Sequence, residues 1–158
     1  MKPLRVYIDT SVFGGYYDDE FADSTRPFFE FIQTGRILPL LSETLVQELV
    51  TAPKRVQDLF DFARRGKHEN LSLDHEVIAL QQSYLHSGII TAKYADDALH
   101  VAQATLARAD VIASWNFHHL VNPAKIRAFS GINITMGYGL VVIMTPSEIV
   151  SILEGNHE

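Results

Sequence analysis

Short runs of β-branched and other apolar residues alternate along this chain with stretches whose apolar positions repeat at helical spacing. The run at 4–8 is typical of a buried strand, whereas Leu45, Val46 and Leu49 recur as they would on a helix. Strands separated by helices imply βαβ units, and right-handed crossovers make most such arrangements doubly wound. We therefore predict a single α/β domain over residues 1–158, with a mainly parallel sheet of about four or five strands and helices on both faces.

The same pattern predicts where the individual elements lie. Besides 4–8, strands are expected at 37–41, 111–113 and 140–144, with a short one at 70–73. Pro39 has no N–H for a ladder, which suggests a kink or an edge-facing position. A loop is expected around Gly131, Gly137 and Gly139. Residues suited to the start of a helix precede the amphipathic stretches, and these are Ser24 or Thr25, Ser42, Pro53, Asp74, Thr91 and Pro146.

The composition narrows the class of protein. With 158 residues, 47% of them hydrophobic and 20% charged, the chain falls in the range of an ordinary globular domain. It has no cysteine, which excludes disulfides, Cys-ligated zinc, iron–sulfur clusters and thiol nucleophiles. No stretch approaches the ~20 apolar residues of a membrane helix, and the start lacks the apolar run of a signal peptide. We therefore expect a soluble cytoplasmic protein that does not bind a membrane.

The formal net charge is −6, which disfavours a protein that coats nucleic acid by phosphate neutralisation alone. An acidic excess also arises where several carboxylates are gathered for a cation. The positions of the acidic residues along the chain distinguish these two cases.

Three acidic residues stand where a carboxylate is informative. Asp9 directly follows the first expected strand, where an Asx turn or a helix cap is the simple alternative to a functional role. Glu48 lies among Leu45 and Leu49, and a solvated helix position is the simple alternative there. Asp97 falls beside the packed stripe of its helix, where a carboxylate needs a partner or a metal.

The polar residues that follow the strands extend this pattern. Asp9 and Asn116 both come just after expected strands, and ligands of doubly wound sheets bind outside the carboxyl ends of strands. Taken in chain order, four segments resemble the PIN domain, and in particular the VapC-type ribonuclease toxins of bacterial and archaeal toxin–antitoxin pairs. These segments are Ile8-Asp9-Thr10-Ser11, Val46-Gln47-Glu48-Leu49, Asp97-Ala98-Leu99-His100-Val101-Ala102 and Ala109-Asp110-Val111-Ile112-Ala113-Ser114-Trp115-Asn116-Phe117-His118-His119-Leu120.

This resemblance implies a three-layer, Rossmann-like PIN fold and a divalent-metal-dependent endoribonuclease that cleaves RNA. It further implies that Asp9, Glu48 and Asp97 are catalytic carboxylates that bind Mg²⁺ or Mn²⁺. Ser11 and Ser114 would be polar neighbours of this site. The partners it implies are an RNA substrate and an antitoxin protein.

Asn116 is a departure from the family pattern, which often has a fourth Asp at this catalytic position. An Asn keeps a carbonyl oxygen as a ligand but removes one negative charge, so a second metal position is in doubt while the first is not.

The physical chemistry of these cations agrees with the assignment. Mg²⁺ and Mn²⁺ take oxygen ligands and keep several waters, so separated carboxylates suffice and no set of Cys or His is needed. Clustered carboxylates repel one another without the cation, so at least one pKa should rise. The three carboxylates also account for half of the net charge of −6, so the remaining surface is less hostile to RNA than that charge suggests.

Other features have simpler explanations. His100, His118 and His119 have no spacing for a transition-metal site and are interpreted as structural histidines. The Gly137-Tyr138-Gly139 segment lacks the context of a dinucleotide loop. The acidic run at 18–20 is interpreted as a solvated loop, and the basic residues at 64–67 as a favourable charge at a helix end, with RNA contact as the alternative.

Two functional hypotheses follow from the sequence. In the first, the protein is a metal-dependent endoribonuclease toxin that an antitoxin inhibits. In the second, it is a catalytically weak relative that binds RNA or protein, which Asn116 permits. A phosphohydrolase with an aspartyl nucleophile is a distant third, because Ser11 stands where its second Asp would be. Phe28, Phe29 and Phe31 exceed what one core was expected to hold, so a homodimer or antitoxin contact is predicted.

Overall fold

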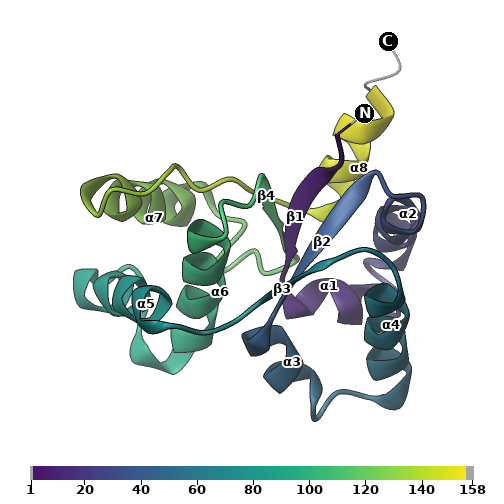
Figure 1. Cartoon of the computed structure of the whole chain (residues 1–158), viewed down its shortest axis with the longest axis horizontal. Helices are drawn as coiled ribbons and strands as arrows, with labels where there is room; N and C mark the ends of the chain where they lie inside the picture. Colours follow the sequence, from purple (N-terminus) through teal and green to yellow (C-terminus); the bar gives the residue numbers. More distant parts are fainter. Residues whose placement is uncertain (1, 156–158) are drawn as a thin grey trace.

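The computed structural model describes residues 2–155, which form a parallel five-stranded sheet between two layers of helices (Figure 1). The sheet order is β3-β2-β1-β4-β5. The expected three-layer, PIN-like α/β class is therefore confirmed. The strands are β1 (Leu4–Ile8), β2 (Ile37–Ser42), β3 (Glu69–Leu71), β4 (Val111–Ala113) and β5 (Ile143–Met144).

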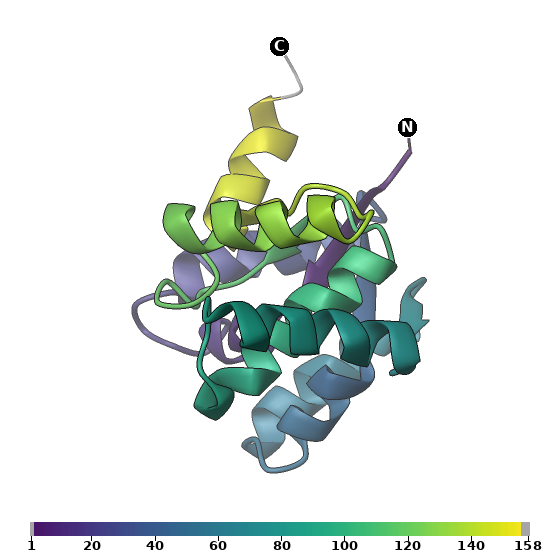
Figure 2. The same cartoon turned by 90° about the vertical axis from the view of Figure 1, so that its left-hand side faces the viewer.

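Helices cover both faces of this sheet. One face packs against α1 (Thr10–Gly15), α2 (Ala22–Gln33), α3 (Glu43–Leu49), α4 (Lys54–Arg65) and α8 (Pro146–Gly155). The other packs against α5 (His75–Ser87), α6 (Ala95–Leu106) and α7 (Pro123–Thr135), the layer that faces the viewer in Figure 2. A short 3-10 helix, η1 (Ala92–Tyr94), leads into α6. No helix within residues 2–155 is long and apolar enough to cross a membrane.

Side chains of the central strand β1 point alternately to the two faces of the sheet, and the core is divided into two parts accordingly. Val6 and Ile8 of β1 are buried against the first layer, whereas Tyr7 is buried against the second. Successive residues of a strand point to opposite faces, so a strand covered on both sides is apolar throughout. This explains why Val6, Tyr7 and Ile8 form a continuous apolar run rather than an alternating one.

Several helix starts are confirmed by their caps. The Ser42 hydroxyl accepts the N–H of Leu45 at 3.1 Å, and the Asp74 carboxylate accepts the N–H of Val77 at 3.0 Å. Both bonds satisfy donors that the first turn of a helix leaves without a partner. Thr91 precedes η1 but makes no side-chain cap bond. The expected long helix begins with this 3-10 turn, and α6 follows it.

The start of α2 differs from the expectation. The helix begins at Ala22, so Ser24 and Thr25 lie inside it rather than capping it. Thr25 is buried, and its hydroxyl donates to the carbonyl of Phe21 at 2.8 Å while accepting from the indole N–H of Trp115 at 2.9 Å. A tertiary contact thus uses the hydroxyl that was expected to cap the helix.

Two helices were not predicted. The Gly14-Gly15 pair was interpreted as a break, yet α1 runs through it. Gly15 fits there because the Trp115 ring lies against it, and an added Cβ would be 2.7 Å from that ring. The segment around Gly131 was expected to be a loop but belongs to α7, whose first residue is Pro123.

Strand β2 is internal in the sheet, although Pro39 suggested an edge position. Pro39 pairs with Val6 of β1, but the pairing of β2 with β3 starts only at Leu40. Within the described residues, β2 therefore has one paired neighbour at the level of Pro39. The missing N–H of Pro39 is tolerated because β2 is locally an edge strand at this point. The strand expected at 140–144 is shorter than predicted and spans only β5.

The phenylalanines of α2 are core residues. Phe28 and Phe29 are buried, and Phe31 packs against the same cluster. The expectation that they exceed one core was wrong, because α4 and α8 join α2 over the sheet and enlarge this part of the core. These side chains therefore give no reason to expect a second copy of the chain.

An ion pair links the central strand to the edge of the sheet. The Arg5 guanidinium donates to both carboxylate oxygens of Glu69, at 2.8 Å and 2.9 Å, and also to the carbonyls of Ala107 and Arg108. The hydrogen bond from Arg5 lowers the pKa of Glu69. The pair therefore stabilises the fold at pH values above the unfolded pKa of Glu69, and this contribution is lost as the pH falls through the lower, folded pKa.

We predict that Glu69→Gln lowers the free energy of unfolding at pH 7 by up to about 1 kcal/mol, because the pair is partly exposed. The difference from the parent should disappear in acid. Urea denaturation across the acidic pH range measures it. Asp58→Asn, which breaks the more exposed pair with Lys54, is the control and should change little. A Glu69→Gln deficit that persists below the folded pKa would contradict the ion-pair explanation.

Candidate functional site

The candidate site lies where the strand order of the sheet reverses. Strands β2 and β3 extend to one side of β1, and β4 and β5 to the other. Asp9 directly follows β1, and its N–H donates to the carbonyl of Ala113, the last residue of β4, at 3.0 Å. In doubly wound sheets the crevice at this point receives the ligand.

Asp9 is nearly buried, with 4% of its surface exposed. It occupies the position before α1 but makes no side-chain cap bond. Instead, its Oδ2 accepts the hydroxyls of Ser11 at 2.6 Å and Ser114 at 2.7 Å. The simple interpretation of Asp9 as a helix cap therefore fails, and both serines expected beside this site contact it.

Backbone groups orient the two serines. The Ser11 oxygen accepts the N–H of Trp115, and the Ser114 oxygen accepts the N–H of Asn116, both at 2.9 Å. Because each oxygen already accepts a bond, each hydroxyl proton is directed at Asp9. The loop after β4 thereby holds the Asp9 carboxylate in one orientation.

Glu48 approaches from α3. Its Oε1 accepts the hydroxyl of Thr10 at 2.7 Å and also contacts Nε2 of His100. Burial opposes the charged carboxylate, but the hydrogen bonds from His100 and Thr10 outweigh it, and the pKa of Glu48 is lowered. Glu48 is therefore ionised at neutral pH and is held by Thr10 of α1 and His100 of α6.

His100 lies between two of the predicted carboxylates. The ring is fully buried, and its Nε2 is 3.5 Å from Oδ1 of Asp9 as well as in contact with Glu48. Its Nδ1 is 2.5 Å from the hydroxyl of Tyr7. Burial disfavours the imidazolium, but the bond to Glu48 and the charges of Asp9 and Glu48 prevail, and the pKa of His100 is raised.

His100 is the functional candidate that the sequence analysis did not select. It is satisfied by hydrogen bonds, as a structural histidine should be, but its partners belong to the acidic site. The signal was its spacing: His100 is three residues after Asp97, so the two share a face of α6.

Asp97 completes the acidic group from the first turn of α6. Burial raises the pKa of Asp97, and the negative charges of Asp9 and Glu48 raise it further. A hydrogen bond from Asn116 and the charge of His100 oppose this. The charges of Asp9 and Glu48 both act on Asp97, so the fold brings the three carboxyl groups near one another, and we call them one electrostatic unit.

Asn116 has a defined orientation. Its Oδ1 accepts the backbone N–H of His119 at 3.0 Å. A backbone N–H requires an acceptor, so the amide nitrogen of Asn116 is the part that can donate to Asp97. The carbonyl oxygen, which was expected to be available to a cation, is bonded to the turn instead.

The donor set fits a hard divalent cation only in part. Hydrogen bonds occupy Oδ2 of Asp9 and Oε1 of Glu48, which leaves Oδ1 of Asp9, Oε2 of Glu48 and the carboxylate of Asp97. Within residues 2–155, no three His, Cys, Asp or Glu side chains form a ready-made metal-binding group. Mg²⁺ is commonly held by one or two carboxylates and retains its waters, so the residues present are chemically suited to it.

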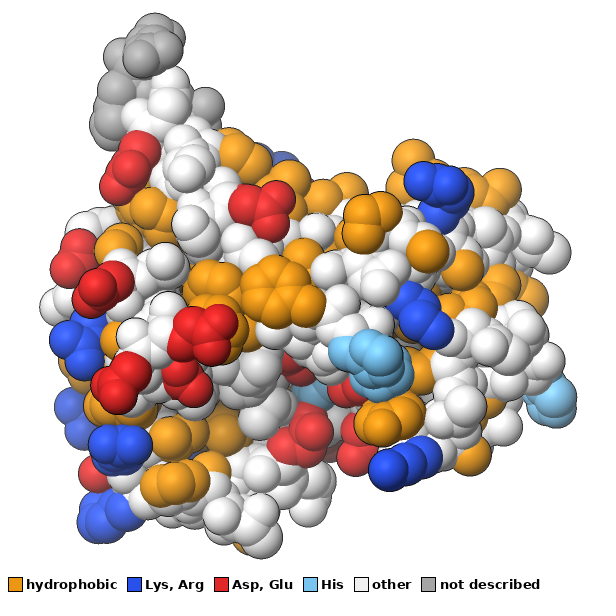
Figure 3. All heavy atoms as spheres, turned by 180° about the vertical axis from the view of Figure 1, so that it is seen from behind, with side chains coloured by type: hydrophobic (Ala, Val, Ile, Leu, Met, Phe, Trp, Pro, Cys, Tyr) orange, Lys and Arg blue, Asp and Glu red, His pale blue; other side chains and the backbone are white. Residues whose placement is uncertain are grey.

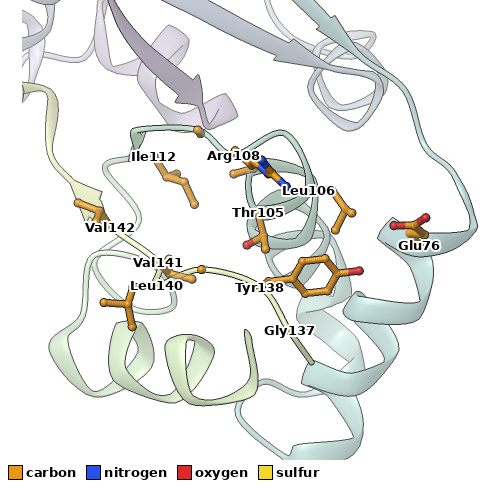
Figure 4. A pocket seen from close by; sticks show the side chains of 13 residues that line it. Glu76, Thr105, Leu106, Arg108, Ile112, Gly137, Tyr138, Leu140, Val141 and Val142 are labelled. Carbon is orange, nitrogen blue, oxygen red and sulfur yellow. The ribbon is translucent and has the colours of Figure 1, made fainter. Parts of the chain in front are cut away.

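The surface agrees with this description. Figure 3 shows acidic side chains gathered around a hollow, with histidine beside them and Lys or Arg at its margin. A separate cavity of about 590 Å³ lies at the opposite end of the sheet, between the end of α6 and the segment that contains Tyr138 (Figure 4). Among the residues described there, Glu76 provides the one carboxylate, so that cavity lacks the charge of the candidate site.

Comparison with known proteins supports the fold. No protein-family model matches the chain, and no curated protein matches its sequence. A solved structure described as VapBC2 from Rickettsia felis, bound to a DNA fragment from their promoter, contains a chain with the same fold. The TM-score is 0.58 at 12% sequence identity, over 90% of this chain and 98% of that chain. A likeness at this identity concerns the fold, so the site must be judged on its own residues.

We predict that Asn116→Asp destabilises the metal-free protein. The new carboxylate keeps the bond to His119 but faces Asp97, and a fourth like charge costs on the order of 1 to 4 kcal/mol. Thermal unfolding in EDTA measures this cost, and added Mn²⁺ should offset it in this variant more than in the parent.

Asn122→Asp is the matched control. Asn122 caps α7 through the N–H groups of Ala124 and Lys125, and Asp caps a helix equally well. Equal stability of Asn116→Asp and the parent would show that Asp97 and residue 116 are not electrostatically coupled.

Proposed function

We propose that this protein is a Mg²⁺- or Mn²⁺-dependent endoribonuclease, and that it acts as the toxin of a toxin–antitoxin pair. The observation that carries the proposal is the electrostatic unit of Asp9, Glu48 and Asp97 at the switch point of a PIN-like sheet. The described VapBC2 complex with the same fold supports an antitoxin as partner.

Each side chain has a defined part in this proposal. Asp9, fixed by Ser11 and Ser114, and Glu48, fixed by Thr10, would hold the cation together with Asp97. When bound, the cation lowers the pKa of a coordinated water and offsets charge on the scissile phosphate. Asn116 lies close enough to Asp97 to lower its pKa and so favours the ionised carboxylate. His100 balances the carboxylates and positions Glu48 through its buried ring.

An antitoxin is the protein partner that fits the exposed surface next to the site. Val46 and Val50, one turn apart on or just after α3, are 39% and 64% exposed. They lie two positions before and after Glu48 and therefore project away from it, so a protein bound there would contact the helix that carries Glu48.

The second candidate is a catalytically weak RNA- or protein-binding module, and His100 favours it. Its ring contacts Glu48 and approaches Asp9, so it supplies part of the countercharge that a cation would supply. The side-chain carbonyl of Asn116 also favours the binding module, because its bond to His119 keeps it from binding a cation. Cleavage assays separate the two candidates.

We predict that the parent cleaves a structured RNA with single-stranded loops when Mg²⁺ or Mn²⁺ is present, and that Asp97→Asn abolishes cleavage while keeping the fold. Asp96→Asn is the matched control, since Asp96 is exposed and adjacent in sequence, and it should retain activity. Gel analysis of RNA products, with circular dichroism of each variant, tests this.

Failure of the parent to cleave with either ion, together with activity in Asn116→Asp, would favour the binding module. Activity in both parent and Asp97→Asn would remove the carboxylate assignment.

A further inference from the structure

Three rings form a small cluster at the margin of the candidate site, with His119 tilted against Tyr94 and edge-on to His118. The ring centroid of His119 is 4.1 Å from that of Tyr94 and 4.3 Å from that of His118. His119 is 9% exposed, whereas Tyr94 is 36% exposed and His118 is exposed. Two accessible rings therefore cover a buried imidazole.

The buried imidazole lacks hydrogen bonds. Among the described residues, neither Nδ1 nor Nε2 of His119 has a partner, although both nitrogens are inaccessible to solvent. Buried polar groups of native proteins are rarely left in this state, because the loss of water is not compensated. Burial, followed by the charges of His118 and Lys125, lowers the pKa of His119, so the neutral ring offers one donor and one acceptor.

The ring cluster lies next to the acidic group. The backbone N–H of His119 donates to Oδ1 of Asn116, and Asn116 is close enough to Asp97 to lower its pKa. Tyr94 is the residue that precedes α6, three positions before Asp97. A group that contacts these rings would therefore lie beside the carboxylates.

Positive charge accompanies the rings. The Lys93 ammonium lies 5.5 Å from the centroid of the Tyr94 ring, and Lys125, whose ammonium donates to the carbonyl of Ile89, is close enough to His119 to influence its pKa. Figure 3 shows histidine, hydrophobic and basic side chains together next to the acidic hollow. An acidic chain with a net charge of −6 thus presents cations at the margin of its acidic site.

We propose that Tyr94, His118 and His119 form a subsite for one unpaired base of single-stranded RNA. The base stacks on the exposed ring of Tyr94, His119 gains hydrogen bonds to the edge of the base when its cover shifts, and Lys93 and Lys125 contact the flanking phosphates. A duplex is excluded because its bases are already stacked and paired, whereas unpaired bases stack readily on aromatic side chains. The inference rests on the proposed function in that this RNA is the one cut at the neighbouring carboxylates.

The test is binding of short fluorescent oligoribonucleotides in EDTA, where metal-dependent cleavage does not interfere. The parent should bind a single strand more tightly than a duplex of equal length. Tyr94→Ala should weaken single-strand binding about tenfold, as expected for loss of one stacked base, and Tyr94→Phe should restore it. In a second series, one nucleotide of the RNA at a time is replaced by an abasic residue. The parent should lose affinity when the abasic residue stands at one particular position, whereas Tyr94→Ala should show no further loss at that position.

Stacking has a spectroscopic signature that a merely structural role would not produce. A 2-aminopurine at the sensitive position should be quenched by the parent and by Tyr94→Phe but not by Tyr94→Ala. Tyr138→Ala is the matched control, because this tyrosine lines the cavity at the other end of the sheet (Figure 4) and should leave binding unchanged. Thermal unfolding of each variant verifies that it is folded.

Equal binding of single strand and duplex, or unchanged binding by folded Tyr94→Ala, would overturn the subsite. These outcomes are independent of cleavage. Single-strand binding that depends on Tyr94 in a protein that never cleaves would uphold the subsite and reject the nuclease. Cleavage by a protein whose RNA binding does not depend on Tyr94 would uphold the nuclease and reject the subsite.

Discussion

The structure depends on holding negative charge at the carboxyl end of its central strand. Asp9 is nearly buried there, and Glu48 and Asp97 approach it from two helices. Because a charge removed from water costs free energy unless it is hydrogen-bonded, these carboxylates need donors. His100 contacts Glu48 through Nε2, and its Nδ1 is hydrogen-bonded to the hydroxyl of Tyr7. Tyr7 in turn bonds at 2.8 Å to Ser42, which caps α3. A closed circuit of polar contacts therefore positions the helix that carries Glu48, and it ties β1, β2, α3 and α6 to one another.

Much of the fold could be predicted from the sequence because strong local signals agreed with the tertiary structure. The strand at 4–8 with its apolar residues Val6, Tyr7 and Ile8, the Ser42 cap and the Asp74 cap depend on neighbouring residues alone, and they lie where expected. The prediction failed where a distant residue decides the outcome. Thr25 bonds to Trp115 instead of capping α2, and Gly15 lies under the same ring within a helix.

The candidate site shows the same division. Their positions along the chain, together with the resemblance to the PIN domain, selected Asp9, Glu48, Asp97 and Ser114, and the fold brings these residues to the switch point. Their roles as metal ligands stay predictions. His100 was interpreted as a structural histidine. Its spacing from Asp97 was the one signal in the sequence, and the contacts of its ring with Glu48 and Tyr7 are what distinguish it from an ordinary core histidine. The orientation of Asn116 likewise depends on its bond to His119, which no local pattern indicates.

The central claim is that these carboxylates form a cation site rather than a polar core completed by His100. The most direct measurement is a crystal structure of the protein soaked in Mn²⁺, with anomalous scattering used to locate the ion. We predict one strong peak bound by Asp9, Glu48 and Asp97 and absent from crystals of Asp97→Asn. A fully soaked crystal in which His100 keeps its contacts with Glu48 and Asp9, and no Mn²⁺ lies among the three carboxylates, would contradict the account.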